Sequence, residues 1–226
     1  MIFRGFGLLL QHWITAFVVW LAMAVAFFIS IIIMPFFGIF GFVLPLLAYA
    51  FVAEFWFSRV HGRDGPGERG ARVLYICWSL IKIKLILAIP FMLILPLAFG
   101  QLFIMPAHMM EHGDGFGFFM LNILHVGFWV ILFLPLWLWF YLRWSLVIPA
   151  TALDGPMKLR DSWKATRGQG FSLALAALVL VGVLALMMFS MVLGGPFLGL
   201  AAYALVALGF NSALYLEVNE AAGQKH

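Results

Sequence analysis

The last long apolar run of this 226-residue chain, residues 168–216, decides the fold. It reads GQGFSLALAALVLVGVLALMMFSMVLGGPFLGLAAYALVALGFNSALYL. These 49 residues include no Asp, Glu, Lys or Arg. A helix needs about 20 apolar residues to cross a bilayer, so the run is long enough for two crossings. Gly194-Gly195-Pro196 stands near its middle, where proline removes a backbone donor and glycine permits a turn. The run therefore predicts a hairpin of two transmembrane helices.

Three further charge-free runs, Gly5–Ala53, Leu85–Met110 and Gly115–Leu142, predict four more helices. The first is long enough for two crossings, with its turn at Met34-Pro35, and the others are long enough for one each. We expect a single transmembrane domain over residues 1–226, with six spans at about His12–Ile33, Phe37–Phe57, Leu85–Met105, Phe118–Tyr141, Phe171–Leu193 and Phe197–Val218.

The composition also predicts an all-α polytopic membrane protein. Hydrophobic residues make up 65% of the chain and charged residues 10%, whereas soluble domains have about 25% charged residues. A soluble globular protein and a disordered chain are therefore excluded. The single cysteine, Cys77, cannot form an internal disulfide. A β-barrel would need alternating apolar and polar residues, but runs such as Val179–Met188 are apolar at nearly every position.

The basic residues predict the orientation. All 13 Lys and Arg residues fall before span 1, between spans 2 and 3, between spans 4 and 5, or after span 6. The positive-inside rule then places both termini in the cytoplasm. A net charge of +4 on one face predicts contact with anionic lipid headgroups. Nucleic acid is not an expected partner, because no separate basic domain is present. Four tryptophans are expected at the same boundary as an aromatic belt: Trp56, Trp78, Trp144 and Trp163.

Two segments between the spans carry most of the basic residues. Residues 61–70 are rich in glycine and predict a flexible solvated loop, followed by an interfacial helix over Val73–Ile81. In the second segment, Pro156 suits the first position of a helix and Gly168 its C-terminal cap. Leu159 and Trp163 share one face, and basic residues cover most of the rest. This pattern predicts a short amphipathic cytoplasmic helix between transmembrane helices 4 and 5. Upstream, the fourth span is too long for one crossing, so it either projects into the cytoplasm or bends at Pro149.

Two stretches of this region resemble a known pattern: Arg143-Trp-Ser-Leu-Val-Ile-Pro-Ala150 and Leu159-Arg-Asp-Ser-Trp-Lys-Ala-Thr-Arg-Gly168. A similar arrangement occurs in a loose group of uncharacterised six-span bacterial inner-membrane proteins. It is also similar to the membrane domain that precedes glycerophosphodiester phosphodiesterases. The resemblance covers about 30 residues plus the six-span layout, and it implies a bacterial inner-membrane protein. The sequence contains no phosphodiesterase domain, so that activity does not carry over.

Arg143 is predicted at the membrane boundary, where an unpaired guanidinium is costly. Its candidate partners are the carboxylates Glu54, Asp154 and Asp161. One interpretation is a structural staple that holds the surface helix. The other is a lipid headgroup site in which Arg143, Lys164 and Arg167 donate hydrogen bonds to a phosphate.

The predicted outer loop after span 3 contains His108-Met-Met-Glu111-His112, which has the H-x-x-E-H pattern of some zinc proteases. On a helix, the two histidines would share a face and could hold a metal, while the neighbouring methionines would suit Cu(I). The loop is too short to form a substrate cleft, so an ordinary interfacial loop is the favoured interpretation. A metal site at His108, Glu111 and His112 is the alternative. His12 and His125 are predicted at different depths, which disfavours a shared haem, and we expect no cofactor.

Polar side chains are few within the spans, and no charged residue is predicted in mid-membrane, which disfavours a pump or an ion-coupled carrier. The sequence predicts a non-enzymatic accessory or structural subunit, or an assembly partner, of a larger membrane complex. The alternative is a small transporter or channel for a metal ion or lipid. A water-filled cavity lined by Asn122, His125 and Asn211 would support that alternative, and a dry packed bundle would contradict it. A metal-dependent enzyme at the outer histidines is the third hypothesis.

Overall fold

The computed structural model describes residues 1–37, 43–103, 132–194 and 196–223, and these residues form helices and no strand. A helical segment at residues 132–145 precedes α7. The other helices, in chain order, are α1 (Ile2–Gln11), α2 (Trp13–Phe37), α3 (Val43–His61), α4 (Arg69–Phe103), α7 (Val147–Leu153), α8 (Leu159–Ala165), the 3-10 turn η2 (Arg167–Gln169), α9 (Gly170–Gly194) and α10 (Pro196–Ala221). The predicted all-α fold class is confirmed.

Six helical stretches are long and apolar enough to cross a membrane: Trp13–Ile33, Val43–His61, Arg69–Pro90, Leu132–Leu153, Arg167–Leu186 and Leu198–Ala221. The protein is therefore a multi-pass membrane protein with the predicted number of crossings. The predicted turn at Gly194-Gly195-Pro196 is also confirmed, since α9 ends at Gly194 and α10 begins at Pro196. Proline suits that first helical position because its missing N–H would have no partner there. By contrast, α2 continues through Pro35 to Phe37, so the helix does not end at Pro35 as expected.

The third crossing differs from the prediction. α4 is one continuous helix from Arg69 to Phe103, so the predicted interfacial helix Val73–Ile81 is its first part. Ile76, Cys77 and Leu80 are buried, which shows that this part packs inside the bundle. The exposed Lys82 and Lys84 do not end the helix, because long basic side chains can extend away from a buried face.

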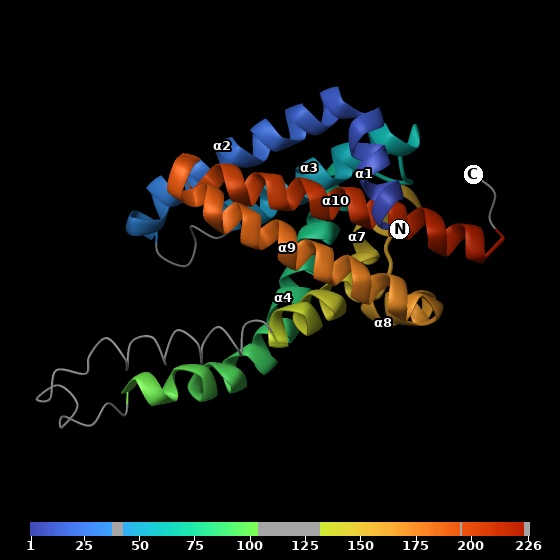
Figure 1. Cartoon of the computed structure of the whole chain (residues 1–226). Helices are drawn as coiled ribbons and strands as arrows, with labels where there is room; N and C mark the ends of the chain where they lie inside the picture. The colour runs from blue at the N-terminus through green and yellow to red at the C-terminus, as the bar shows by residue number, and fades with distance from the viewer. Residues whose placement is uncertain (38–42, 104–131, 195, 224–226) are drawn as a thin grey trace, which may run out of the picture.

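α10 lies at the centre of the bundle, packed against α9, α1, α2, α7 and α3 (Figure 1). Residues that are buried make up 67% of its apolar window, compared with 22–44% in the other five crossings. Glycine allows the closest of these approaches. A Cβ at Gly5 of α1 would lie 2.6 Å from the ring of Phe210, and one at Gly209 would lie 2.9 Å from Leu9. Trp56 is also fully buried in this core, so its predicted place in an aromatic belt is wrong.

α7 is a short helix whose seven residues are all buried, and it packs against α3, α4 and α10. The helical segment 132–145 is interrupted at Leu146 before α7 begins. Pro149, the third residue of α7, has no N–H to donate to the carbonyl of Ser145, which explains a break at this place. The interruption falls three residues before Pro149, the predicted bend position.

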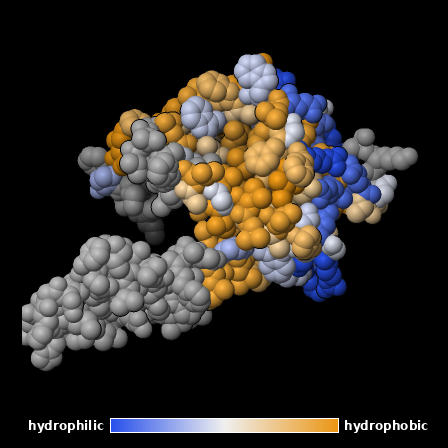
Figure 2. All heavy atoms as spheres, in the orientation of Figure 1, coloured by the Kyte–Doolittle hydropathy of each residue, from blue (hydrophilic) through white to orange (hydrophobic). Residues whose placement is uncertain are grey.

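Hydrophilic residues gather at one end of the molecule, while its middle is largely apolar (Figure 2). We call this the polar end and define it by the loop 62–68, α8, η2, the start of α1 and the end of α10. The start of α1 and the end of α10 lie together (Figure 1), because the Met1 amino group contacts Glu217 and Arg4 pairs with Glu220 at 2.7 Å. At the polar end, α3, α4, α7, α8 and α10 connect to loops. The candidate site lies at this end.

Candidate functional site

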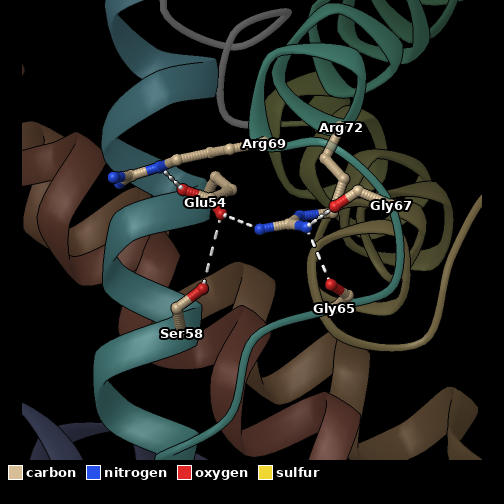
Figure 3. A network of polar contacts seen from close by, with 6 residues as sticks. All are labelled: Glu54, Ser58, Gly65, Gly67, Arg69 and Arg72. Carbon is tan, nitrogen blue, oxygen red and sulfur yellow. Dashed lines mark hydrogen bonds and ion pairs between the residues drawn. The ribbon is translucent and has the colours of Figure 1, made fainter.

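Glu54 of α3 binds two arginines of α4 at the polar end (Figure 3). Its side chain is 1% exposed. Oε1 accepts a hydrogen bond from Arg72 Nη2 at 2.7 Å, and Oε2 accepts one from Arg69 Nε at 2.6 Å. Ser58, one helical turn later, donates to Oε1 at 3.5 Å. A carboxylate is costly to bury alone, so this double pairing is what allows Glu54 to lie inside the bundle.

Arg72 also fixes the glycine-rich loop. Its Nη1 donates to the carbonyl oxygens of Gly65 and Gly67, both at 2.7 Å. Gly65 is pressed against α7, since a Cβ there would lie 2.2 Å from the carbonyl oxygen of Ala152. The loop is thus held between Arg72 and α7, and the prediction of a flexible solvated loop is wrong for its centre. Gly67 has a φ of +81°, a conformation that favours glycine.

A second cluster joins the same loop to α10. Arg63 Nη2 pairs with Asp154 Oδ1 at 2.9 Å, and the hydroxyl of Tyr215 donates to Asp154 Oδ2 at 2.5 Å. Arg63 also donates to the Tyr215 hydroxyl. These side chains are more exposed than Glu54, with 40% and 47% exposure for Arg63 and Asp154. Asp154 directly follows α7, so this cluster fixes the far end of that buried helix.

Arg143 is buried, with 7% exposure, but its partners are aromatic. Its guanidinium carbon lies 4.5 Å from the ring centre of Trp139 and 4.4 Å from that of Trp163. Within the described ranges, no carboxylate pairs with it. The three predicted carboxylate partners are therefore wrong. Glu54 and Asp154 are taken by other arginines, and Asp161 faces a different cavity.

Arg143 nevertheless holds α8, as the structural-staple interpretation expected. Trp163 belongs to α8, and the hydroxyl of Ser162 on the same helix donates to the carbonyl oxygen of Arg143. Ser162 and Thr166 are the fully buried side chains of this segment, whereas Leu159 and Trp163, which the sequence places together on one face, are partly buried. The helix also begins at Leu159, later than the predicted start at Pro156, and ends before Gly168.

Two open cavities at the polar end carry most of the positive charge. One, of about 680 Å³, is lined by four arginines of the first segment: Arg59, Arg63, Arg69 and Arg72. The other, of about 360 Å³, is lined by Trp144, Arg160, Trp163, Lys164 and Arg167. Of the three predicted headgroup donors, the structure brings Lys164 and Arg167 together in the smaller cavity. Arg143 does not line it.

The predicted metal ligands His108, Glu111 and His112 lie outside the described residues, as do Asn122 and His125. Within the described part of the chain, no group of three or more His, Cys, Asp or Glu side chains could hold a metal ion. Asn211 is fully buried and accepts a hydrogen bond from Ser145 Oγ at 2.6 Å, a contact between two helices.

Sequence reasoning missed the pairing of Glu54 with Arg72 and the burial of α7. One signal for the pairing was present: Glu54 is the only acid in the second predicted span, and four arginines follow it within the next 18 residues. No comparable signal marked Tyr215 as a partner of Asp154, because 61 residues separate them.

Comparison of the chain with protein-family models, with curated proteins and with solved structures finds no match.

Proposed function

We propose that the chain is a non-enzymatic integral membrane protein that serves as an accessory or structural subunit, or an assembly partner, of a larger membrane complex. The observation that carries this proposal is that the carboxylates of Glu54 and Asp154 are both engaged within the protein. Glu54 binds three side chains of the protein itself and Asp154 binds two, and each carboxylate joins separate elements. A general acid or base must reach a substrate to transfer a proton. These carboxylates are instead engaged in holding α3, α4, α7 and α10 together.

The proposal includes an orientation, with the polar end and both termini in the cytoplasm of a bacterial inner membrane. The gathering of arginine and lysine at the polar end supports it through the positive-inside rule. The same basic end would rest on anionic lipid headgroups. The resemblance to six-span bacterial inner-membrane proteins supports the location, and we expect no nucleic-acid partner.

The alternative proposal, a small transporter or channel for a metal ion or lipid, receives less support from the packing around Asn211. Asn211 and Ser212 are fully buried, and Ser212 accepts a hydrogen bond from Trp56 Nε1 at 2.9 Å. A conduit needs polar groups that face water along its path. At this level of the bundle, the Asn211 side-chain oxygen and the Ser212 hydroxyl accept hydrogen bonds from other helices, while Asn211 Nδ2 is buried without a hydrogen-bond partner among the described residues.

The exposed apolar faces offer a way to test for a partner. Phe17 and Leu21 of α2 are 56% and 49% exposed, and Leu175 and Leu178 of α9 are 47% and 54% exposed. Lipid would surround all of these side chains in a protein that acts alone. A stoichiometric partner would cover one face and leave the other in lipid.

The experiment places a photo-crosslinking residue at each of these four positions, one at a time, in native membranes. We expect adducts with one and the same protein from the positions on one helix and none from the other helix. The complex solubilised in mild detergent should have the matching mass on a native gel. Val19 of α2, which is 1% exposed, is the matched buried control and should give no adduct. Absence of any protein adduct, together with a native mass of the chain alone, would overturn the proposal.

A further inference from the structure

The smaller cavity at the polar end concentrates positive charge that nothing in the described protein neutralises. Arg160, Lys164 and Arg167 line it, and no carboxylate of the described ranges forms an ion pair with any of them. Asp161, the one acid on α8, lines a different cavity together with Asp154 and Tyr215. α8 therefore separates its charges, with the basic side chains on one cavity and the acid on another.

Two tryptophan rings form the remaining wall of this cavity, and their positions are fixed by their neighbours. The ring of Trp163 stacks on Phe140 at 5.7 Å between centres and lies 5.8 Å from Trp144. Arg143 lies against the Trp163 ring as well. The indole ring suits a membrane boundary, because it has an apolar body and a polar N–H. The cavity thus combines three cations with a rigid aromatic wall.

An apolar row leads away from this wall along the preceding helical segment. Leu132, Leu136, Phe140 and Trp144 follow one another at intervals of four residues, which places them on one face of a helix. Leu132 is 52% exposed and Leu136 is 48% exposed. The row begins at Leu132, the first residue of the apolar stretch Leu132–Leu153, and reaches the cationic cavity at Trp144. A basic cavity with an adjoining apolar row matches a molecule with an anionic head and an apolar tail.

We propose that this cavity binds the phosphate of an anionic phospholipid headgroup, with the lipid chain lying along the row from Trp144 to Leu132. Arg160, Lys164 and Arg167 would donate hydrogen bonds to the phosphate oxygens, which guanidinium and ammonium groups recognise by charge and geometry. Arg143 holds the aromatic wall from behind Trp163 and is a positioning residue. The inference rests on the proposed function only in requiring the polar end to lie at a membrane surface. It does not depend on a partner protein.

The test compares two double variants that remove the same charge. K164Q/R167Q removes two cavity cations, while R59Q/K158Q removes two exposed cations that do not line this cavity. Lipid binding is measured by native mass spectrometry of the detergent-purified full chain, titrated with phosphatidylglycerol and, separately, with phosphatidylcholine. We take about 1 kcal/mol, roughly a fivefold change in affinity, for each cation that contacts the bound headgroup. We expect K164Q/R167Q to weaken binding of the first phosphatidylglycerol about 30-fold and R59Q/K158Q to weaken it much less, because its two cations do not line the cavity, with little change for phosphatidylcholine in either variant.

Three outcomes would overturn the inference. Equal losses in the two double variants would mean that net charge, and not the cavity, attracts the lipid. A larger loss in R59Q/K158Q would assign binding to the arginine-lined cavity. Displacement of phosphatidylglycerol from the wild-type protein by millimolar sn-glycerol 3-phosphate would assign the cavity to a soluble phosphate ester. Retention of the lipid in its presence is the expected result.

Folding and assembly are followed in the same samples. Both double variants change exposed side chains, so their unfolding temperatures should match that of the wild-type protein. The single variant R160Q removes the third cavity cation and provides an independent measurement of lipid binding. Photo-crosslinking from α2 and α9 in the K164Q/R167Q background separates the two proposals. Lost lipid in this background with unchanged protein adducts would leave the partner proposal standing. The absence of any adduct from wild-type protein that still binds phosphatidylglycerol would overturn the partner proposal alone.

Discussion

Arg72 and Arg143 are both buried arginines at the polar end, yet the protein stabilises them in different ways. Arg72 is 8% exposed, and its two terminal nitrogens donate to Glu54 and to two loop carbonyls. Arg143 is 7% exposed and lies between the rings of Trp139 and Trp163, without a carboxylate from the described residues. The protein therefore buries Arg72 with an ion pair and Arg143 with aromatic rings.

The difference determines whether a substitution at each site leaves an unpaired charge inside the protein. Loss of Glu54 would leave an unpaired charge inside the protein, because no other carboxylate of the described residues pairs with Arg72. Loss of Arg143 would strand no charge, because the two tryptophans are neutral. Removing one member of a buried ion pair is more destabilising than removing a cation from neutral partners.

Glu54→Gln should give the largest loss of stability. It keeps the shape of the side chain but leaves Arg72 buried without a countercharge, and such changes cost about 3–5 kcal/mol. Chemical unfolding in mixed detergent micelles measures the effect. The double variant E54L/R72M removes both charges and should recover much of the loss, since apolar replacement of a whole buried pair is often neutral. A loss below about 1 kcal/mol for E54Q would show that Arg72 does not depend on this carboxylate.

Gly65→Ala tests the close approach of the loop to α7 that Arg72 maintains. The new Cβ would lie 2.2 Å from the carbonyl oxygen of Ala152, and backbone atoms cannot move aside as a flexible side chain can. Overpacking of this kind costs about 1–3 kcal/mol, again measured by chemical unfolding. Gly70→Ala is the matched control, because its Cβ would meet nothing within 4 Å. Similar stabilities for the two alanine variants would mean that the loop can shift away from α7.

Arg143→Met should have a smaller effect than Glu54→Gln. It removes two cation–π contacts, which contribute about 0.5–2 kcal/mol each according to their desolvation, and it leaves no unpaired charge. Arg143→Lys should recover only part of the loss, since an ammonium cannot stack between two rings as a planar guanidinium does. Tryptophan fluorescence should report the altered environment of Trp139 and Trp163. If R143M were as destabilising as E54Q, a carboxylate partner of Arg143 would have to exist.

The fold was predictable from the sequence because membrane crossing imposes a strong, local constraint. The charge-free runs gave the number of crossings, and Gly194-Gly195-Pro196 gave the turn of the last hairpin, each from neighbouring residues alone. The third crossing was misplaced because Lys82 and Lys84 were taken as its boundary. In the bundle, their long side chains remain exposed while Ile83, between them, is fully buried. A charge count cannot distinguish a helix end from an exposed face of a continuing helix.

The polar end was less predictable, since its contacts join residues that are distant in the sequence. The partners of Arg143 depend on how α7 and α8 pack. Nothing in the sequence around Leu146 indicated that the helix is interrupted there. Ser162 and Thr166 were overlooked as buried residues because small hydroxyl side chains do not contribute to an apolar pattern. The grouping of Lys164 with Arg167 was predictable, because both lie on one short segment, whereas the tryptophan wall required the packing of two helices.

Arg4→Gln should have the smallest effect, because its pair with Glu220 is exposed, with side-chain exposures of 39% and 57%. Such pairs contribute about 0.2–1 kcal/mol, far less than a buried pair. The hydrogen bond to Glu220 raises the pKa of Arg4 above its already high ordinary value, so salt and not pH is the useful variable. The stability difference between wild type and R4Q should shrink as salt screens the pair. A salt-independent loss as large as that of E54Q would contradict the view that burial, and not pairing alone, sets the strength of the charges at this end.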